Sequence, residues 1–198
     1  MITVFSLVTV AMLSISNQLS PVSASCVVRI DSLTMNCIAE NTHMSPRRFL
    51  GTLPPVQGPG ICSWEILLYE ETRSELIDND LVMWQHMLMM ECSYNHAGFE
   101  VTTNYYFDQD ENAVLCISSW WLNSEVLPLF MDRFYYSQGE VIAYAYDEES
   151  LVSPSESHRE KGTARLAYLR YILDNIVSDS PGAPPVFMEQ IEYIYENY

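Results

Sequence analysis

Residues 108–112, Asp-Gln-Asp-Glu-Asn, place three carboxylates and two amides in a short polar stretch. Asp108, Asp110 and Asn112 match the first, third and fifth positions of an EF-hand calcium loop. The match then ends, because Ala113 stands where that loop requires glycine and Ser119 where it requires a bidentate glutamate. We therefore expect a solvated hairpin tip without a bound metal.

Other catalytic patterns are missing from the sequence. The four histidines, at positions 43, 86, 96 and 158, are scattered, and no nucleophile elbow, zinc-protease helix, phosphate-binding loop or dinucleotide glycine pattern occurs. Cys92 and His96 are close enough to share a metal, but a closed zinc site needs four ligands and no second pair is present. These absences favour a protein that is not an enzyme and holds no cofactor.

Aromatic residues offer a different chemistry, that of recognition. The chain has 13 tyrosines, and tyrosine and tryptophan combine a large contact area with a hydrogen-bonding tip. Neighbouring tyrosines on a strand point to opposite faces, so one face can pack under helices while the other presents phenols. The alternative is that the aromatic side chains fill the core. The candidate binding residues are Tyr105, Tyr135, Tyr144 and Trp120, with Asp108 and Asp110 beside them.

The N-terminus has the pattern of a secretion signal. The first 25 residues carry no charged side chain, and the mostly apolar run over residues 4–15 is shorter than the about 20 residues that span a membrane. Val22-Ser23-Ala24 fits the small-residue rule of signal peptidase. We predict a signal peptide over residues 1–24 and a single secreted domain over residues 25–198, with no transmembrane segment.

The net charge of −17 narrows the class of partner. Lys161 is the only lysine, and the stretch from Ser74 to Asp132 has ten acidic residues and no basic one. Such a surface repels polyphosphates, which disfavours nucleic acid and anionic membranes, and it attracts basic proteins by electrostatic steering. We predict a basic extracellular protein as the partner. The alternative is an acidic surface that serves solubility alone.

Five cysteines are present, at positions 26, 37, 62, 92 and 116. In an oxidising compartment this number predicts two disulfide bonds and one spare thiol, and the sequence leaves the pairing open. The local pairings would be Cys26 with Cys37 and Cys92 with Cys116.

The first half of the chain is hard to assign to elements. Residues 26–30 and 34–38 resemble short strands, and prolines and glycines make residues 51–60 a loop. Apolar residues then recur at helical spacing over residues 64–88. The run over residues 81–92 is apolar at so many positions that it fits either a buried helix or a long central strand.

The second half is clearer. β-branched and aromatic residues are concentrated in four segments with short polar joints, which predicts an antiparallel meander. Gln138-Gly139 fits the hairpin turn before the last segment. The four segments are residues 99–107, 113–121, 126–136 and 141–146.

Helices are expected to follow the meander. One apolar stripe from Leu166 to Val177 predicts an amphipathic helix of about five turns, and residues 184–198 predict a shorter terminal helix. Strands followed by segregated helices make an α+β domain. The predicted fold is thus a four-stranded antiparallel meander packed with a long amphipathic helix and a short C-terminal helix, preceded by short strands and helical segments.

A short motif near the N-terminus carries one family resemblance. The segment Arg29-Ile30-Asp31-Ser32 resembles the Arg-x-Asp-Ser opening of the ADP-ribosyltransferase toxin A chains of the cholera and pertussis type. The resemblance implies a first strand on which Arg29 would help to hold NAD, with Asp31 and Ser32 in support.

Export, charge and the missing catalytic patterns together predict a secreted acidic binding protein. Its partner is expected to be a basic extracellular protein, recognised through an aromatic and carboxylate-rich surface. Two alternatives belong to other classes: a secreted toxin-like ADP-ribosyltransferase, and a carrier of a small apolar ligand in a cavity under the helices.

Overall fold

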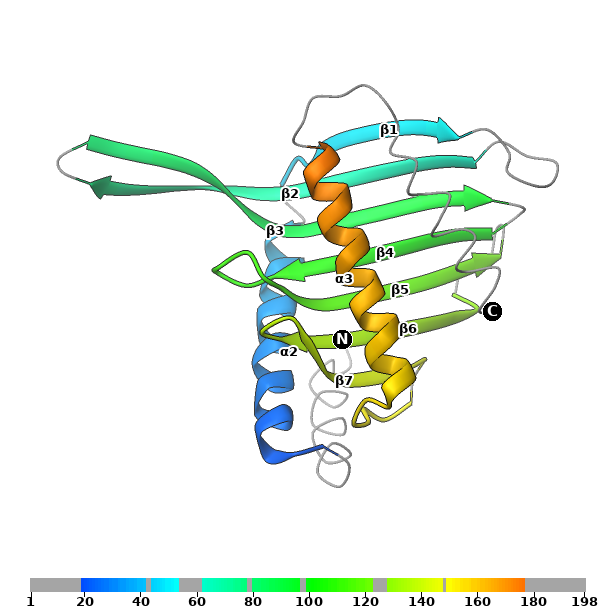
Figure 1. Ribbon diagram of the computed structural model, residues 1–198. Coiled ribbons are helices and arrows are strands. Elements are labelled where there is room, and N and C mark those ends of the chain that lie inside the picture. The colour runs from blue at the N-terminus through cyan, green and yellow to red at the C-terminus, as the bar shows by residue number, and fades with distance from the viewer. Residues whose placement is uncertain are drawn as a thin grey trace, which may run out of the picture.

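The centre of the protein is one seven-stranded antiparallel sheet (Figure 1). The computed structural model describes residues 19–41, 44–53, 62–77, 80–96, 99–122, 128–147 and 149–176. The strands lie in the sheet in the order of the sequence, so each is joined to its neighbours along the chain. They are β1 (Arg47–Leu53), β2 (Cys62–Ile77), β3 (Asp80–His96), β4 (Phe99–Phe107), β5 (Ala113–Leu122), β6 (Phe130–Ser137) and β7 (Glu140–Tyr146).

Two helices cover opposite faces of this sheet. Helix α2 (Pro21–Asn41) contacts β5, β6 and β7 on one face, and α3 (Glu156–Ile176) crosses the other face diagonally (Figure 1). Each helix closes a hydrophobic core of its own. Leu169 and Ile172 pack into the core under α3, and Val27 and Ile30 pack into the core under α2. The sheet is therefore the middle layer of the described structure.

The predicted fold class is wrong. The four predicted strands coincide with β4 to β7, but β1, β2 and β3 continue the same antiparallel order, so the sheet has seven strands. The two described helices flank the strands in the sequence and lie on opposite faces, whereas the prediction placed a long and a short helix after the meander and short strands where α2 lies.

The region over residues 64–88, predicted to be helical, forms most of β2 and β3. The open assignment of residues 81–92 is likewise resolved as strand. Helical spacing is informative when apolar residues are buried on one side. Here several of them, including Leu76, Leu81 and Met83, are exposed, so their spacing reflects no buried helix face.

The segments 26–30 and 34–38, predicted to be strands, lie within α2. The Oγ atom of Ser20 accepts a hydrogen bond from the backbone N–H of Ser23 at 3.1 Å, which caps the helix, and Pro21 occupies its first position. Buried side chains recur at intervals of three and four residues, as a helix requires. They are Val27, Ile30, Thr34 and Cys37.

The position of α2 bears on two further predictions. Arg29 and Ser32 lie on this helix, exposed, and not on the first strand that the toxin resemblance implies. Asp31 accepts a hydrogen bond from the Tyr135 hydroxyl at 2.9 Å.

A cut after Ala24 would remove the helix cap together with the first turn. The signal peptide stays a prediction.

The turn between β6 and β7 is confirmed at Gln138 and Gly139. Both residues have positive φ, 53° and 79°, as a type I′ hairpin turn requires. Residues 51–53 of the predicted loop belong to β1. The rest of that loop and the terminal helix predicted over residues 184–198 lie outside the described residues.

Cys26, Cys37, Cys92 and Cys116 form no disulfide with one another. The pairings suggested by sequence proximity are therefore not present. Burial raises the pKa of Cys92 strongly and that of Cys116 to about 11. Both thiols stay protonated at neutral pH, which disfavours their use as nucleophiles or metal ligands.

Candidate functional site

The four aromatic residues predicted to bind a partner lie in the interior. Tyr105, Tyr135, Tyr144 and Trp120 are each at most 9% exposed. The Tyr105 hydroxyl donates to the backbone oxygen of Arg165 at 3.2 Å, and the Trp120 ring stacks on a neighbouring phenylalanine. An exposed recognition surface is therefore not built from these side chains. The hydroxyl groups of Tyr105 and Tyr135 instead bond the sheet to α3 and α2.

A polar seam lies between α3 and the sheet. We define the α3 seam as Thr103, Ser118, Asp132 and Arg165. Arg165 donates to Ser118 Oγ at 2.6 Å and lies 3.4 Å from an Asp132 carboxylate oxygen. The Asp132 side chain is 1% exposed and that of Arg165 14%. With Tyr144 donating to Asp132 at 2.6 Å, the seam satisfies its own charges and is well suited to anchor α3.

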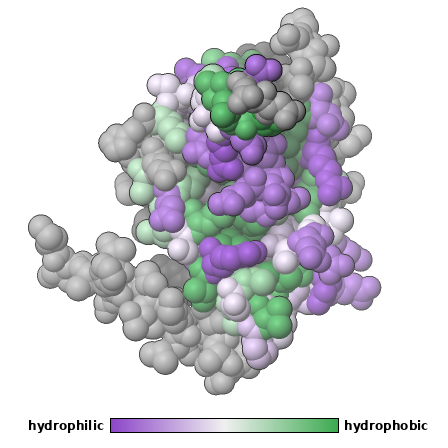
Figure 2. All heavy atoms as spheres, turned by 90° about the vertical axis from the view of Figure 1, so that its left-hand side faces the viewer, coloured by the Kyte–Doolittle hydropathy of each residue, from purple (hydrophilic) through white to green (hydrophobic). Residues whose placement is uncertain are grey.

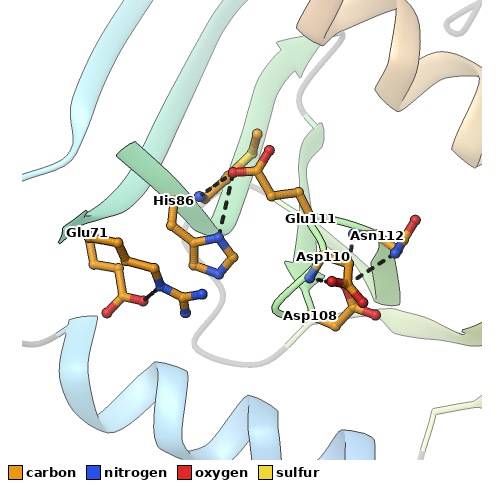
Figure 3. Close-up of polar contacts among 8 residues, drawn as sticks. Glu71, His86, Asp108, Asp110, Glu111 and Asn112 are labelled. Carbon is orange, nitrogen blue, oxygen red and sulfur yellow. Dashed lines mark hydrogen bonds and ion pairs between the residues drawn. The ribbon is translucent and has the colours of Figure 1, made fainter. Parts of the chain in front are cut away.

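Asp108 and Asp110 lie in the β4–β5 turn, which we define as residues 108–112. One Asp108 carboxylate oxygen accepts the backbone N–H groups of Asp110 and Asn112, at 3.0 and 2.9 Å (Figure 3). Glu111 has a positive φ of 60°, which the turn holds in place. Among the described residues, no group of three or more His, Cys, Asp or Glu side chains is placed to hold a metal ion.

The largest group of exposed apolar side chains among the described residues lies on a hairpin that protrudes from the sheet. We define the arm as residues 70–77 of β2 and 80–87 of β3. Pairing between β1 and β2 stops at Leu68, and pairing between β3 and β4 stops at Met89, so the arm extends beyond both neighbours (Figure 1). Hydrophobic residues gather at the end of the arm, above a hydrophilic band (Figure 2). The large apolar side chains, 40–67% exposed, are Leu76, Ile77, Leu81, Val82, Met83 and Trp84.

Carboxylates lie along the arm and at its base. Arg47 neutralises Glu70 at 2.7 Å and Arg73 neutralises Glu71 at 2.5 Å. Among the described residues, the other acidic side chains of the arm and the β4–β5 turn form no ion pair with arginine or lysine. Together the described arm and the β4–β5 turn carry seven acidic residues and one arginine: Glu70, Glu71, Glu75, Asp80, Asp108, Asp110 and Glu111 against Arg73.

The arm and the β4–β5 turn meet at His86. The imidazole Nδ1 of His86 lies 3.5 Å from a Glu111 carboxylate oxygen, and the same oxygen accepts the backbone N–H of Met87 at 3.4 Å (Figure 3). The His86 side chain is 3% exposed, whereas that of Glu111 is 48% exposed. Glu111 thus links the base of the arm to the turn while part of its carboxylate faces solvent.

Acidic residues also gather on strands β2, β3 and β4 within the body of the sheet. Burial raises the pKa of Glu91, and the neighbouring carboxylates of Glu65 and Glu100 raise it further. Arg48 forms an ion pair with Glu65. The mutual repulsion of these carboxylates gives this part of the molecule a negative potential that a cationic partner would relieve.

The sequence contained a signal for the arm that helical spacing obscured. Asp78-Asn79 is a two-residue polar joint between two apolar runs, which is a hairpin pattern. The side chains of Val82 and Trp84 stand across from Glu75 and Arg73 in the paired register. Reading the two runs as partners would have predicted the hairpin, though not the exposure of its apolar residues.

No helix among the described residues is both long enough and apolar enough to cross a membrane. Comparison of the chain with protein-family models, curated proteins and solved structures finds no match.

Proposed function

We propose that the protein binds a basic extracellular protein and that the arm, with the β4–β5 turn, is its recognition element. The observation that carries the proposal is the group of six large apolar side chains exposed on one protruding hairpin. Apolar groups of this kind, bordered by polar residues, are typical of protein interaction sites. Aromatic residues and methionine, represented here by Trp84 and Met83, are enriched at interfaces.

The charge of the chain supports a basic partner. Net charge is −17, and the acidic residues of the arm and turn outnumber their arginine by seven to one. A cationic protein would be steered towards this surface, and its association rate would fall as salt screens the charges. The buried Tyr105, Tyr135 and Tyr144 take no direct part in this proposed surface. Asp108 and Asp110, which the sequence suggested as binding residues, lie in the β4–β5 turn and remain part of the proposal.

The proposal is tested by affinity capture from extracellular fluid with three forms of the purified chain. The wild type is compared with the double variant Leu76→Ser, Leu81→Ser, which removes a directly paired apolar contact at the end of the arm. The control is Leu50→Ser on β1, because Leu50 is 62% exposed and lies outside the arm.

We expect the wild type and the control to capture the same basic protein, identified by mass spectrometry and released by salt. The arm variant should lose it. Equal capture by all three forms, or capture that is independent of salt, would contradict recognition by the arm.

A further inference from the structure

We propose that the outer edge of β3 within the arm accepts an extended segment of the partner as an additional antiparallel strand. The segment would carry basic residues at its N-terminal end. This inference rests on the proposed function and specifies how the arm would bind. Strand addition to an open sheet edge is a general mode of peptide recognition, in which backbone hydrogen bonds supply affinity and alternate side chains supply specificity.

The edge of β3 is open along the arm. β4 pairs with β3 only from Met89 onwards, so residues 80–87 have β2 on one side and no strand on the other among the described residues. The N–H of Met87 points outward, since it donates to Glu111 of the β4–β5 turn. Successive residues of a strand direct their backbone groups to alternate sides. The backbone groups of Leu81, Met83 and Gln85 must therefore also point outward.

Pairing between β2 and β3 within the arm agrees with outward-facing backbone groups at Leu81, Met83 and Gln85. The register is regular from Met87 to Asp80, and Ile77 pairs with Asp80 next to the two-residue joint of the hairpin. Because the outward residues of β3 alternate with those bonded to β2, three pairs of outward N–H and C=O groups are available to an added strand. Such an edge is a template for pairing with another chain.

The faces of the arm define the side chains that an added strand would meet. Leu81, Met83 and Gln85 lie on one face, and Val82 and Trp84 lie on the other. Both faces expose large apolar groups. Apolar or β-branched residues at alternate positions of the bound segment would contact them, as cross-strand neighbours do in a sheet.

The direction of the segment follows from the position of the β4–β5 turn. A strand antiparallel to β3 would begin at the base of the arm and run towards its end, which is the direction in which β4 would continue. Its N-terminal residues would meet the acidic turn, where Asp110 and Glu111 are exposed. Lysine or arginine at that end complements the turn. A second copy of this chain would instead bring a net charge of −17 against an equal charge.

The opposite edge, on β2, is less suited to a basic segment. Pairing with β1 ends at Leu68, and the guanidinium of Arg47 lies beside Glu70 at 2.7 Å. That cation neutralises the nearest carboxylate and would repel a lysine or arginine of an incoming strand. The charge complementarity therefore selects the β3 edge.

Proline substitutions distinguish the two edges. Met83→Pro removes an outward N–H of β3 and leaves the bonds between β2 and β3, so the hairpin is kept while the edge is blocked. Ser74 pairs directly with Met83, so Ser74→Pro makes the equivalent change on the β2 edge and is the matched control. Circular dichroism of both variants checks that the sheet is retained.

The probe is a fluorescent peptide, Lys-Arg-Val-Thr-Val-Thr-Val-Thr, measured by anisotropy. It is compared with two versions in which the backbone is N-methylated at one or the other set of alternate residues. We expect Met83→Pro to weaken binding by about tenfold or more through the loss of backbone hydrogen bonds, and Ser74→Pro to leave it unchanged. Only one of the two N-methylated sets should abolish binding, because only one faces β3.

Several results would overturn the inference. These are equal effects of the two N-methylated sets, loss of binding in Ser74→Pro in place of Met83→Pro, or dimerisation of the chain through the arm without peptide binding. Capture of the basic protein distinguishes the two proposals. If Met83→Pro captures it as well as the wild type, the edge inference fails and the proposed function stands. If the wild type captures no basic protein, the proposed function fails.

Discussion

The α3 seam allows a prediction about one substitution, Asp132→Asn. It should lower the free energy of unfolding in the wild type and raise it in the Arg165→Met variant. Arg165→Met removes the guanidinium and leaves the Asp132 carboxylate, 1% exposed, with the hydrogen bond from Tyr144 but without the cation. Asp132→Asn keeps an acceptor for that hydroxyl and removes the negative charge. In the wild type, Asp132→Asn deprives Arg165 of its counter-charge. In Arg165→Met, the same change removes a buried negative charge that has lost the Arg165 cation.

The expected magnitudes follow from these contacts. Removing one member of a buried ion pair costs about 3 kcal/mol, and Arg165→Met also gives up the bond to Ser118 at 2.6 Å. Asp132→Asn alone should cost about 2 kcal/mol, because the ion pair is long at 3.4 Å. In the Arg165→Met background, the same Asp132→Asn change should restore about 1 kcal/mol, since it neutralises a buried carboxylate that has lost the Arg165 cation.

Urea unfolding of the four proteins, followed by tryptophan fluorescence, measures this double-mutant cycle. Equal m-values across the four proteins would show that the midpoints report stability alone. If Asp132→Asn lowers the free energy of unfolding by the same amount in both backgrounds, the two residues are not coupled and the seam does not act as we describe.

Three other perturbations test separate parts of the fold. Gly162→Ala places a Cβ against a methyl carbon of Val141, so it should lower the free energy of unfolding in urea by about 1–2 kcal/mol despite a better helix propensity. Val141→Ala should reduce that loss, and additive effects of the two substitutions would contradict the clash. Burial raises the pKa of Asp31 above 3.8 despite the Tyr135 hydrogen bond, so the folded chain binds this proton more tightly and stability falls as pH rises through the raised pKa. Asp31→Asn should therefore show a smaller loss of unfolding free energy between acidic and neutral pH, and an unchanged pH profile would refute this assignment. Ser20→Ala should destabilise the uncleaved chain by about 1 kcal/mol in thermal unfolding, whereas a secreted form cut after Ala24 should be insensitive, which N-terminal sequencing of that form would check.

The part of the sheet from β4 to β7 could be predicted because its strands are rich in β-branched and aromatic residues and their joints are short. Buried and more exposed side chains alternate over residues 100–105 of β4, as in a strand. Gln138-Gly139 then fixed the last hairpin, since glycine readily adopts the positive φ of 79° found there. Residue types within and between these strands were therefore sufficient to predict them.

The strands of the first half were missed for a physical reason. Periodicity records which side chains are buried, and the arm buries few of its apolar residues. Leu76 and Leu81 are directly paired and both exposed, so their spacing resembled that of a helix by coincidence. The helical spacing of Val27, Ile30 and Thr34 was present in α2 but was read as two strands with a turn between them.

The sequence located only part of the surface that we propose as the candidate site. Asp108 and Asp110 were placed in a hairpin turn, which the structure confirms. The tyrosines were assigned to a surface, but their hydroxyls find partners inside: Tyr105 with Arg165 and Tyr135 with Asp31. Composition cannot distinguish a phenol that faces solvent from one that bonds to a helix, because the difference depends on which helix covers which face of the sheet.

The sequential order of the seven strands has a kinetic consequence. Every neighbouring pair in the sheet is also a neighbouring pair along the chain, so no strand waits for a distant partner. Folding rates rise as contacting residues become closer in sequence. We expect the sheet to assemble by successive hairpins faster than a β-sandwich of similar size, in which strands pair across long loops. Helices α2 and α3, which lie before and after the strands, would dock on a sheet that has already formed.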